Sequence, residues 1–384
     1  MSVYEKLGVR KVINAAGTLT MLGGSLMPPE VLEAMNEAAK AFVLMDELHE
    51  KAGKVIAEIT GAEAGYVTAG AAAGLVLATA ACIAGKDPEK IRRLPFTEGM
   101  KNEVIIPKIH RNPYDQAFSQ AGARLIEIGT SEGFSPSDLE AAITERTAAI
   151  AFIFFTSRKF CDMETLKEVV KVAKKHGIPV IVDAAAELPP LENLRDIIAA
   201  GADIVAFSGG KAIQGPNDSG FVCGRKELIE ACALQGCPHH AIGRPMKIGK
   251  EQIVGLVVAL QRYVSKDHTA DRDRWEAVVR FFLEEFSNIP HVKVRRLFPD
   301  PSKGEYSAQC WPRAQIIIDE ESLGMKVSEI TNILRSGNPA IWTEARGNSI
   351  VINPHCLVDG EEKIIARRLK EIFESAIMRN RARS

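Results

Sequence analysis

Short apolar runs of strand length alternate with helical patterns between residues 64 and 226. Seven such runs occupy residues 64–70, 102–109, 124–129, 148–155, 178–185, 204–210 and 220–226. Several of them are apolar on both faces, which is typical of strands that helices cover on each side. The pattern therefore predicts an α/β domain built on a seven-stranded, mostly parallel sheet.

Capping signals mark helices between these runs. Asp162 or Thr165 opens a helix that ends at Gly177, which is followed by Pro179. Ser135, with a proline directly after it, opens another helix that ends near Ile143.

The pattern changes after Pro238. Two long helical stretches cover residues 250–264 and 271–287, and a smaller unit follows with strands at 292–297, 314–319 and 349–353 and helices at 328–335 and 361–377. We expect the N-terminal forty residues to pack on this unit. The predicted organisation is an N-terminal segment (1–45), a large domain (46–247), and linking helices with a small C-terminal α/β domain (248–384).

Composition and charge narrow the function classes. The chain has 384 residues, 46% hydrophobic and 25% charged, as expected of a folded protein. A formal charge of -1 provides no general attraction for nucleic acid or anionic membranes. The longest apolar stretch, residues 70–85, is too short and too rich in alanine to span a membrane, and the first residues lack a signal-peptide profile. We therefore expect a cytoplasmic protein without nucleic-acid or membrane partners.

Cysteine and histidine spacing argues against a metal site. The seven cysteines are scattered and never form a Cys-x-x-Cys pair, which predicts reduced thiols rather than disulfides or zinc ligands. They are Cys82, Cys161, Cys223, Cys232, Cys237, Cys310 and Cys356. The adjacent His239 and His240 have no acidic or thiol partner at ligand spacing, so no metal is expected.

Polar residues at strand ends are the first candidates for chemistry, because ligands collect beyond the carboxyl ends of parallel strands. Asp183 closes one strand, Lys211 follows another, and the sequence TAGAAAG (68–74) joins a third strand to an alanine-rich helix. Each alone has an ordinary structural explanation. Together they supply the amine, the carboxylate and the helix-terminal amides that pyridoxal 5'-phosphate requires.

The sequence around Lys211 resembles a known lysine loop. Residues 207–220, FSGGKAIQGPNDSG, are similar to the loop of fold type I pyridoxal-phosphate enzymes, in the branch of bacterial selenocysteine synthase (seryl-tRNA selenium transferase). RKVINAAG (10–17), IVINP (350–354) and LVDGE (357–361) resemble that branch too, so the similarity covers nearly the whole chain. It implies a large cofactor domain with a smaller C-terminal α/β domain, and a homodimer or a ring of dimers.

The resemblance assigns roles to individual residues. Lys211 would carry the cofactor and move the proton at the substrate's α-carbon, while Asp183 would pair with the pyridinium nitrogen. Two residues would pack on the faces of the ring and four would surround the phosphate: Ala185 and His110, then Ser208, Gly70, Ala71 and Ala72. His110 could equally be an ordinary histidine at a strand end. Gly215 and Gly220 are expected to let the loop turn tightly.

Basic residues are the candidates for binding an anionic substrate. Arg244 and Lys247 lie in a cluster, RPMKIGK (244–250), that aligns with a basic stretch of the selenium transferases. The cluster could hold an anion or could consist of solvated charges before a helix. Arg111 and Arg346 are further candidates for the substrate carboxylate.

Two departures favour a small substrate over tRNA. The shared block begins at Arg10, which leaves no room for the tRNA-binding domain of selenocysteine synthases, and Gly210 replaces their acidic residue before the lysine. Residues 4–14, YEKLGVRKVIN, resemble shorter members of the branch that include ammonia-lyases acting on glucosaminate 6-phosphate. The implied reaction is α,β-elimination of an amino acid or amino-sugar acid to a 2-oxo acid and ammonia. Selenium transfer, racemase or aldolase chemistry, and non-catalytic cofactor binding remain alternatives.

Overall fold

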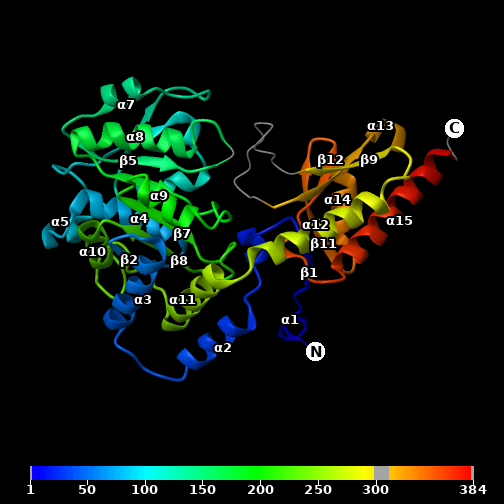
Figure 1. Cartoon of the computed structure of the whole chain (residues 1–384), viewed down its shortest axis with the longest axis horizontal. Helices are drawn as coiled ribbons and strands as arrows, with labels where there is room; N and C mark the ends of the chain where they lie inside the picture. Colours follow the sequence, from blue (N-terminus) through cyan, green and yellow to red (C-terminus); the bar gives the residue numbers. More distant parts are fainter. Residues whose placement is uncertain (1, 157, 298–310, 382–384) are drawn as a thin grey trace. The chain divides into compact units, whose positions relative to one another are not determined.

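The computed structural model describes residues 2–156, 158–297 and 311–381, which form two compact units (Figure 1). The small unit contains residues 2–25, 267–297 and 311–381, and the large unit contains residues 26–156 and 158–266. Cys310 lies outside the described residues.

The large unit is built on one seven-stranded sheet. Its strand order is β2-β8-β7-β6-β5-β3-β4, and β8 is antiparallel to both neighbours while the other pairs are parallel. The strands are β2 (Ala64–Thr68), β3 (Glu103–Pro107), β4 (Arg124–Ile128), β5 (Thr147–Ile153), β6 (Val180–Asp183), β7 (Ile204–Ser208) and β8 (Gly220–Gly224). All seven coincide with the apolar runs, which confirms the predicted sheet.

Helices precede, connect and follow these strands along the chain. They are α2 (Pro29–Ala38), α3 (Met45–Thr60), α4 (Gly70–Ala84), α5 (Pro88–Arg93), α6 (Gln116–Gln120), α7 (Pro136–Ala142), α8 (Met163–His176), α9 (Asn193–Ala199), α10 (Lys226–Gln235) and α11 (Lys250–Ser265). Asp162 caps α8 by accepting the Thr165 N–H at 2.9 Å, and Gly177 ends it in the left-handed conformation. Ser135 caps α7. Both caps are those expected from the sequence.

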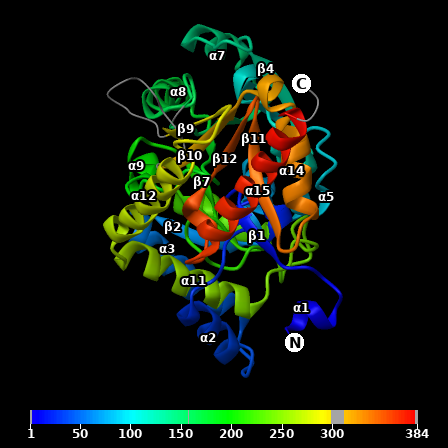
Figure 2. The same cartoon turned by 90° about the vertical axis from the view of Figure 1, so that its right-hand side faces the viewer.

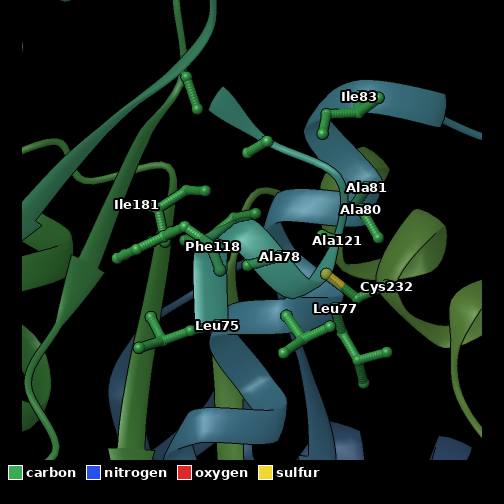
Figure 3. Packing of buried hydrophobic residues seen from close by; sticks show 14 of the residues in the cluster. Leu75, Leu77, Ala78, Ala80, Ala81, Ile83, Phe118, Ala121, Ile181 and Cys232 are labelled. Atoms are coloured by element: carbon green, nitrogen blue, oxygen red, sulfur yellow. The ribbon is translucent and has the colours of Figure 1, made fainter. Parts of the chain in front are cut away.

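Helix α4 forms the centre of the large unit's core. It is apolar on every side and buried along nearly its whole length. Figure 3 shows Leu75 and Ala78 of α4 toward Phe118 of α6 and Ile181 of β6, and Leu77 of α4 beside Cys232 of α10. The helix lies close to the sheet, because a Cβ at Gly74 would come within 2.9 Å of Val222 Cγ1. Small residues on α4 are therefore required by its close packing on the strands.

The small unit has a five-stranded sheet of order β1-β11-β12-β10-β9. Its elements are α1 (Val3–Lys6), β1 (Val12–Ala15), α12 (His268–Glu285), β9 (Val292–Leu297), β10 (Arg313–Ile318), α13 (Glu320–Leu323), α14 (Val327–Ser336), β11 (Ala340–Arg346), β12 (Ser349–Ile352) and α15 (Glu361–Arg381). Apolar residues of α12, α14 and α15 share one core with this sheet. Figure 2 shows these helices together with the strands of the small unit. Strands β9, β10 and β12 match the predicted ones, whereas the sequence patterns missed β1 and β11.

The boundaries of the two units differ from the expected divisions at 45/46 and 247/248. Residues 2–25 join the small unit through β1, which pairs in parallel with β11. Helix α2 instead packs on α11 within the large unit, where a Cβ at Gly255 would lie 2.8 Å from Met35 Cγ. This packing places residues 26–45 and 248–266 in the large unit.

No helix within the described part of the chain combines the length and the apolar character needed to cross a membrane.

Candidate active site

Asp183 and Lys211 lie at the carboxyl edge of the large sheet. Asp183 is the last residue of β6 and pairs with Ile153 of β5 and Ala206 of β7. Lys211 follows the end of β7 at Ser208. Asp183 is 9% exposed, and its Oδ1 accepts the Ala185 N–H at 3.0 Å. The structure thus brings together the amine and the carboxylate that the sequence singled out.

Burial and mutual attraction act in opposite directions on these two groups. Burial holds the pKa of Asp183 above its usual value, although the Ala185 N–H and the Lys211 charge act in the opposite direction. Burial lowers the pKa of Lys211, while Asp183 and Glu187 raise it. A lysine with a lowered pKa is easier to deprotonate and is a better proton acceptor at neutral pH.

The N-terminus of α4 lies close to this edge. Thr68, the last residue of β2, pairs with Gly220 of β8, which in turn pairs with Ser208 of β7. Helix α4 begins two residues after Thr68, at Gly70, and has no acidic residue in its first turn. Its first N–H groups lack acceptors within the helix, so they can bind an anion. Gly70 has φ +87°, and a Cβ built there would meet no atom within 4 Å.

Gly220 fixes the distance between β8 and the first turn of α4. A Cβ on Gly220 would lie 2.6 Å from the carbonyl carbon of Gly70 and 2.7 Å from the amide nitrogen of Ala71. The expected reason for this glycine, a tight turn of the loop, is therefore wrong: Gly220 is needed because two backbones approach closely. The turn after Lys211 is made instead by Gln214, which has φ +62°.

His110 is held by the backbone on both sides of its ring. It is 2% exposed at the end of a short 3-10 helix, Lys108–His110, directly after β3. Its Nε2 donates to the Phe160 carbonyl at 2.7 Å, and its Nδ1 accepts the Ile153 N–H at 3.2 Å. Burial lowers the pKa of His110 to about 4, so the ring is neutral at pH 7. The His110 ring is therefore held in a fixed position near Asp183, and neither of its nitrogens is free for proton transfer.

Glu187 is a further group at this edge that the sequence patterns did not identify. It lies in the loop after β6 and is 1% exposed. Its Oε2 accepts both the N–H and the Oγ1–H of Thr156, each at 3.0 Å. Burial raises the pKa of Glu187 to about 8, with a further contribution from Asp183. The signal in the sequence was a single acidic residue in an otherwise apolar stretch, which alone indicates little.

The candidate cofactor contacts show different degrees of exposure. Ala71 is buried, Ala72 is exposed, and Ala185 and Ser208 are half-buried. All four belong to the large unit.

The basic candidates are in different settings. The Arg111 side chain pairs with Asp115 and Glu127, so binding a substrate would require it to leave these carboxylates. Arg244 and Lys247 are exposed in the segment before α11. Arg346 belongs to β11 of the small unit and pairs with Glu344 at 2.5 Å.

Within the described ranges, no group of three or more His, Cys, Asp or Glu side chains is arranged to hold a metal ion. The cysteines in those ranges are all free thiols.

A protein-family model described as "SelA: L-seryl-tRNA selenium transferase" matches residues 12–276. The chain belongs to the SelA family. It is 37% identical to the D-glucosaminate-6-phosphate ammonia lyase of Salmonella typhimurium, over 98% of this chain and 99% of that protein. It is also 34% identical to a 5'-C-glycyluridine monooxygenase-decarboxylase of a Streptomyces species, over 96% of this chain and 92% of that protein.

A solved structure of D-glucosaminate-6-phosphate ammonia-lyase matches with a TM-score of 0.84 and 36% identity, over 98% of this chain and 99% of that one. This SelA-family protein therefore has the fold type I architecture of pyridoxal-phosphate-dependent transferases, as the lysine loop suggested.

Gly220→Ala should displace the first turn of α4, because the added methyl group has no space against the backbone of Gly70 and Ala71. Overpacking of this kind destabilises by about 1–3 kcal/mol, and it should weaken pyridoxal phosphate binding at the same time. Thermal unfolding and spectrophotometric titration with pyridoxal phosphate test this. Cys223→Ala on the same strand is the matched control and should retain tight binding. Unchanged binding by Gly220→Ala would show that the α4 terminus does not hold the phosphate.

Proposed function

We propose that this SelA-family protein is a pyridoxal-phosphate-dependent ammonia-lyase acting on D-glucosaminate 6-phosphate or a closely similar amino-sugar acid. The observation that carries the proposal is the Lys211–Asp183 pair beside the α4 N-terminus. It occurs in a chain that is similar over nearly its whole length to an ammonia lyase.

The residues present fit pyridoxal phosphate. The site offers a buried carboxylate for a cationic ring nitrogen, an amine for the aldehyde, and free helix amides for the phosphate. Gly70 leaves open space where a side chain would otherwise stand. Lys211, Asp183, Gly70, Ala71 and Ser208 would hold the cofactor, with Ala72, Ala185 and His110 around it.

When bound, the cofactor withdraws electrons from the α-carbon of an amino acid and so makes its hydrogen acidic. Lys211 is the group that takes that hydrogen, because burial favours its neutral form. Asp183 keeps a positive charge on the ring nitrogen, because an ionised carboxylate at a buried position requires a cationic partner. The neutral His110, fixed at both nitrogens, holds its position without exchanging protons.

The anionic groups of the substrate need cations. Arg244 and Lys247 are exposed basic residues of the large unit and suit a distal phosphate. Arg111 and Arg346 are the candidates for binding the substrate's carboxylate. Each would have to leave the acidic side chains with which it now forms ion pairs.

A homodimer, or a ring of dimers, is part of the proposal. Large apolar side chains are exposed along residues 26–44: Phe42 fully, Leu44 at 75% and Leu26 at 67%. Exposed apolar side chains gathered in one segment mark protein interfaces. We assign a second copy of this chain as the partner that covers these exposed apolar side chains. The cytoplasm is the proposed compartment, because reduced cysteines suit a reducing environment.

Lys211→Ala should abolish both cofactor attachment and turnover. The wild-type protein with pyridoxal phosphate should release ammonia and a 2-oxo acid from D-glucosaminate 6-phosphate, and borohydride should fix the cofactor to Lys211 irreversibly. Lys226→Ala, at the opposite end of β8, is the matched control and should behave like wild type. Inverted chirality of the substrate without release of ammonia would indicate a racemase. Oxygen uptake with release of carbon dioxide would indicate an oxidative decarboxylase. Activity only on a charged tRNA would indicate a selenium transferase.

Asp183→Asn should retain the fold and lower turnover roughly a thousandfold, several kcal/mol of barrier, because the neutral amide does not stabilise a cationic ring nitrogen. Steady-state kinetics and the absorption spectrum of the loaded protein measure the effect. Asp203→Asn provides the control. Asp203 lies just before β7, at the end of that strand opposite Lys211, and its carboxylate accepts the Val180 N–H at 2.8 Å. Equal turnover in both variants would contradict the role of Asp183.

Phe42→Asp combined with Leu44→Glu should weaken self-association at least tenfold, because charges replace apolar side chains in the proposed interface. Sedimentation velocity over a concentration series measures the change. Phe96→Asp alters another exposed aromatic residue, 77% exposed, and should leave the assembly unchanged. Association of the double variant at wild-type concentrations would place the interface elsewhere.

A further inference from the structure

Glu187 has one oxygen that the chain leaves without a partner. Its Oε2 accepts two hydrogen bonds from Thr156, and its backbone carbonyl accepts the Asn193 side-chain amide at 2.7 Å. Its Oε1 is buried and meets no hydrogen-bond partner among the described residues. A buried polar atom of this kind indicates a ligand or a functional role.

The hydrogen bonds also indicate which oxygen carries the proton. Both Thr156 groups donate to Oε2, so a proton on this carboxyl group belongs on Oε1. Burial raises the pKa of Glu187 to about 8, which keeps the group protonated at neutral pH. Oε1–H is therefore a hydrogen-bond donor without an acceptor in the described chain.

The charged and titratable groups around Glu187 come from three elements. Asp183 at the end of β6 and Lys211 after β7 both interact with it electrostatically, and Cys161, before α8, is a third neighbour. Burial raises the pKa of Cys161 to about 12, so it stays neutral. Glu187 thus belongs to the same edge of the sheet as the proposed Lys211–Asp183 pair.

Elimination of a hydroxyl group requires an acid, because hydroxide is a poor leaving group. His110 has both nitrogens bound to the backbone, and Asp183 serves as an anion. Of the groups at this edge, Glu187 has a proton and an uncommitted oxygen to deliver it.

We propose that Glu187 is the general acid of the elimination and protonates the departing β-hydroxyl through Oε1. This inference rests on the proposed function. Lys211 takes the α-hydrogen, and the electron pair of that C–H bond forms the Cα–Cβ double bond. The Cβ–O bond breaks with its pair on oxygen, which takes the Glu187 proton and leaves as water. The Lys211 ammonium then returns a proton to the Glu187 carboxylate, so no external reagent is consumed.

Glu187→Gln separates proton transfer from hydrogen bonding. The glutamine amide can still accept hydrogen bonds from Thr156 and can donate one, but it cannot transfer a proton to the leaving group. The variant should load pyridoxal phosphate with the wild-type absorption spectrum. It should exchange the substrate's α-hydrogen in D₂O within about threefold of wild type, because this step belongs to Lys211. Formation of the 2-oxo acid from D-glucosaminate 6-phosphate should fall by about a hundredfold or more.

The pH profile supplies a second readout. Wild-type elimination should decline above pH 8 as Glu187 loses its proton, with α-hydrogen exchange unaffected, and the residual elimination by Glu187→Gln should lack that decline. Glu103→Gln is the matched control: Glu103 is a buried carboxylate that accepts the Thr144 hydroxyl at 2.8 Å, at the start of β3. It should preserve both reactions and the wild-type profile.

Elimination by Glu187→Gln at the wild-type rate would overturn the proposal and assign the proton to the Lys211 ammonium. Loss of exchange together with elimination would overturn it in favour of a structural role. If Glu187→Gln does not fold, Thr156→Val is the second test. Loss of the Thr156 hydroxyl donor disfavours the ionised form of Glu187, so the decline of elimination at alkaline pH should move to higher pH. A decline at the same pH as in the wild type would contradict the role of Glu187 as general acid. A wild-type protein that neither exchanges nor eliminates would overturn the proposed function, and this role with it.

Discussion

The site depends on the balance of charge among one amine and two carboxyl groups buried at the same sheet edge. Two carboxylates beside a single ammonium would leave one negative charge uncompensated in a dry environment. Burial raises the pKa of both carboxyl groups, so we propose that Asp183 is ionised beside the cationic ring of the cofactor and that Glu187 is protonated. Because both Thr156 groups donate to Oε2, that proton belongs on Oε1. The three groups interact with one another electrostatically.

Backbone packing places this set near the N-terminus of α4, whose first N–H groups have no acceptor within the helix. The absence of a side chain at Gly220 lets β8 approach the first turn of α4, while the small residues of α4 allow it to lie flat on the sheet. Helix α4 is buried almost throughout, so its N-terminus cannot shift without disturbing the core (Figure 3). The rigidity of the site thus comes from the same packing that stabilises the large unit.

The sequence predicted the parts of the structure that leave a local pattern. All seven strands of the large sheet lie within short, mainly apolar runs; Asp183 ends one of these strands, and Lys211 lies three residues after the end of another. Strand β1 was missed because it pairs with β11 across most of the chain length. Strand β11 was missed too, although it also pairs with the neighbouring β12. The N-terminal forty residues were expected to pack together on the small unit, but from residue 26 onward they belong to the large unit. The reason is similar, since the packing of α2 on α11 is a tertiary contact. Glu187 gave only a weak signal in the sequence, because its position depends on burial and on hydrogen bonds from Thr156, neither of which is local in sequence.

Lys211 and Asp183 do not by themselves select a reaction. Removal of an α-hydrogen can lead to racemisation, aldol cleavage or elimination, and relatives with similar identity to this chain carry the names of a lyase and of a monooxygenase-decarboxylase. The outcome is decided by what happens at the neighbouring carbon once the α-hydrogen is gone. A protonated carboxyl group near Lys211 favours departure of a hydroxyl, because it removes the need to release hydroxide into a desolvated site. The proposed role of Glu187 thus assigns the selection of elimination to the loop after β6 rather than to the lysine loop.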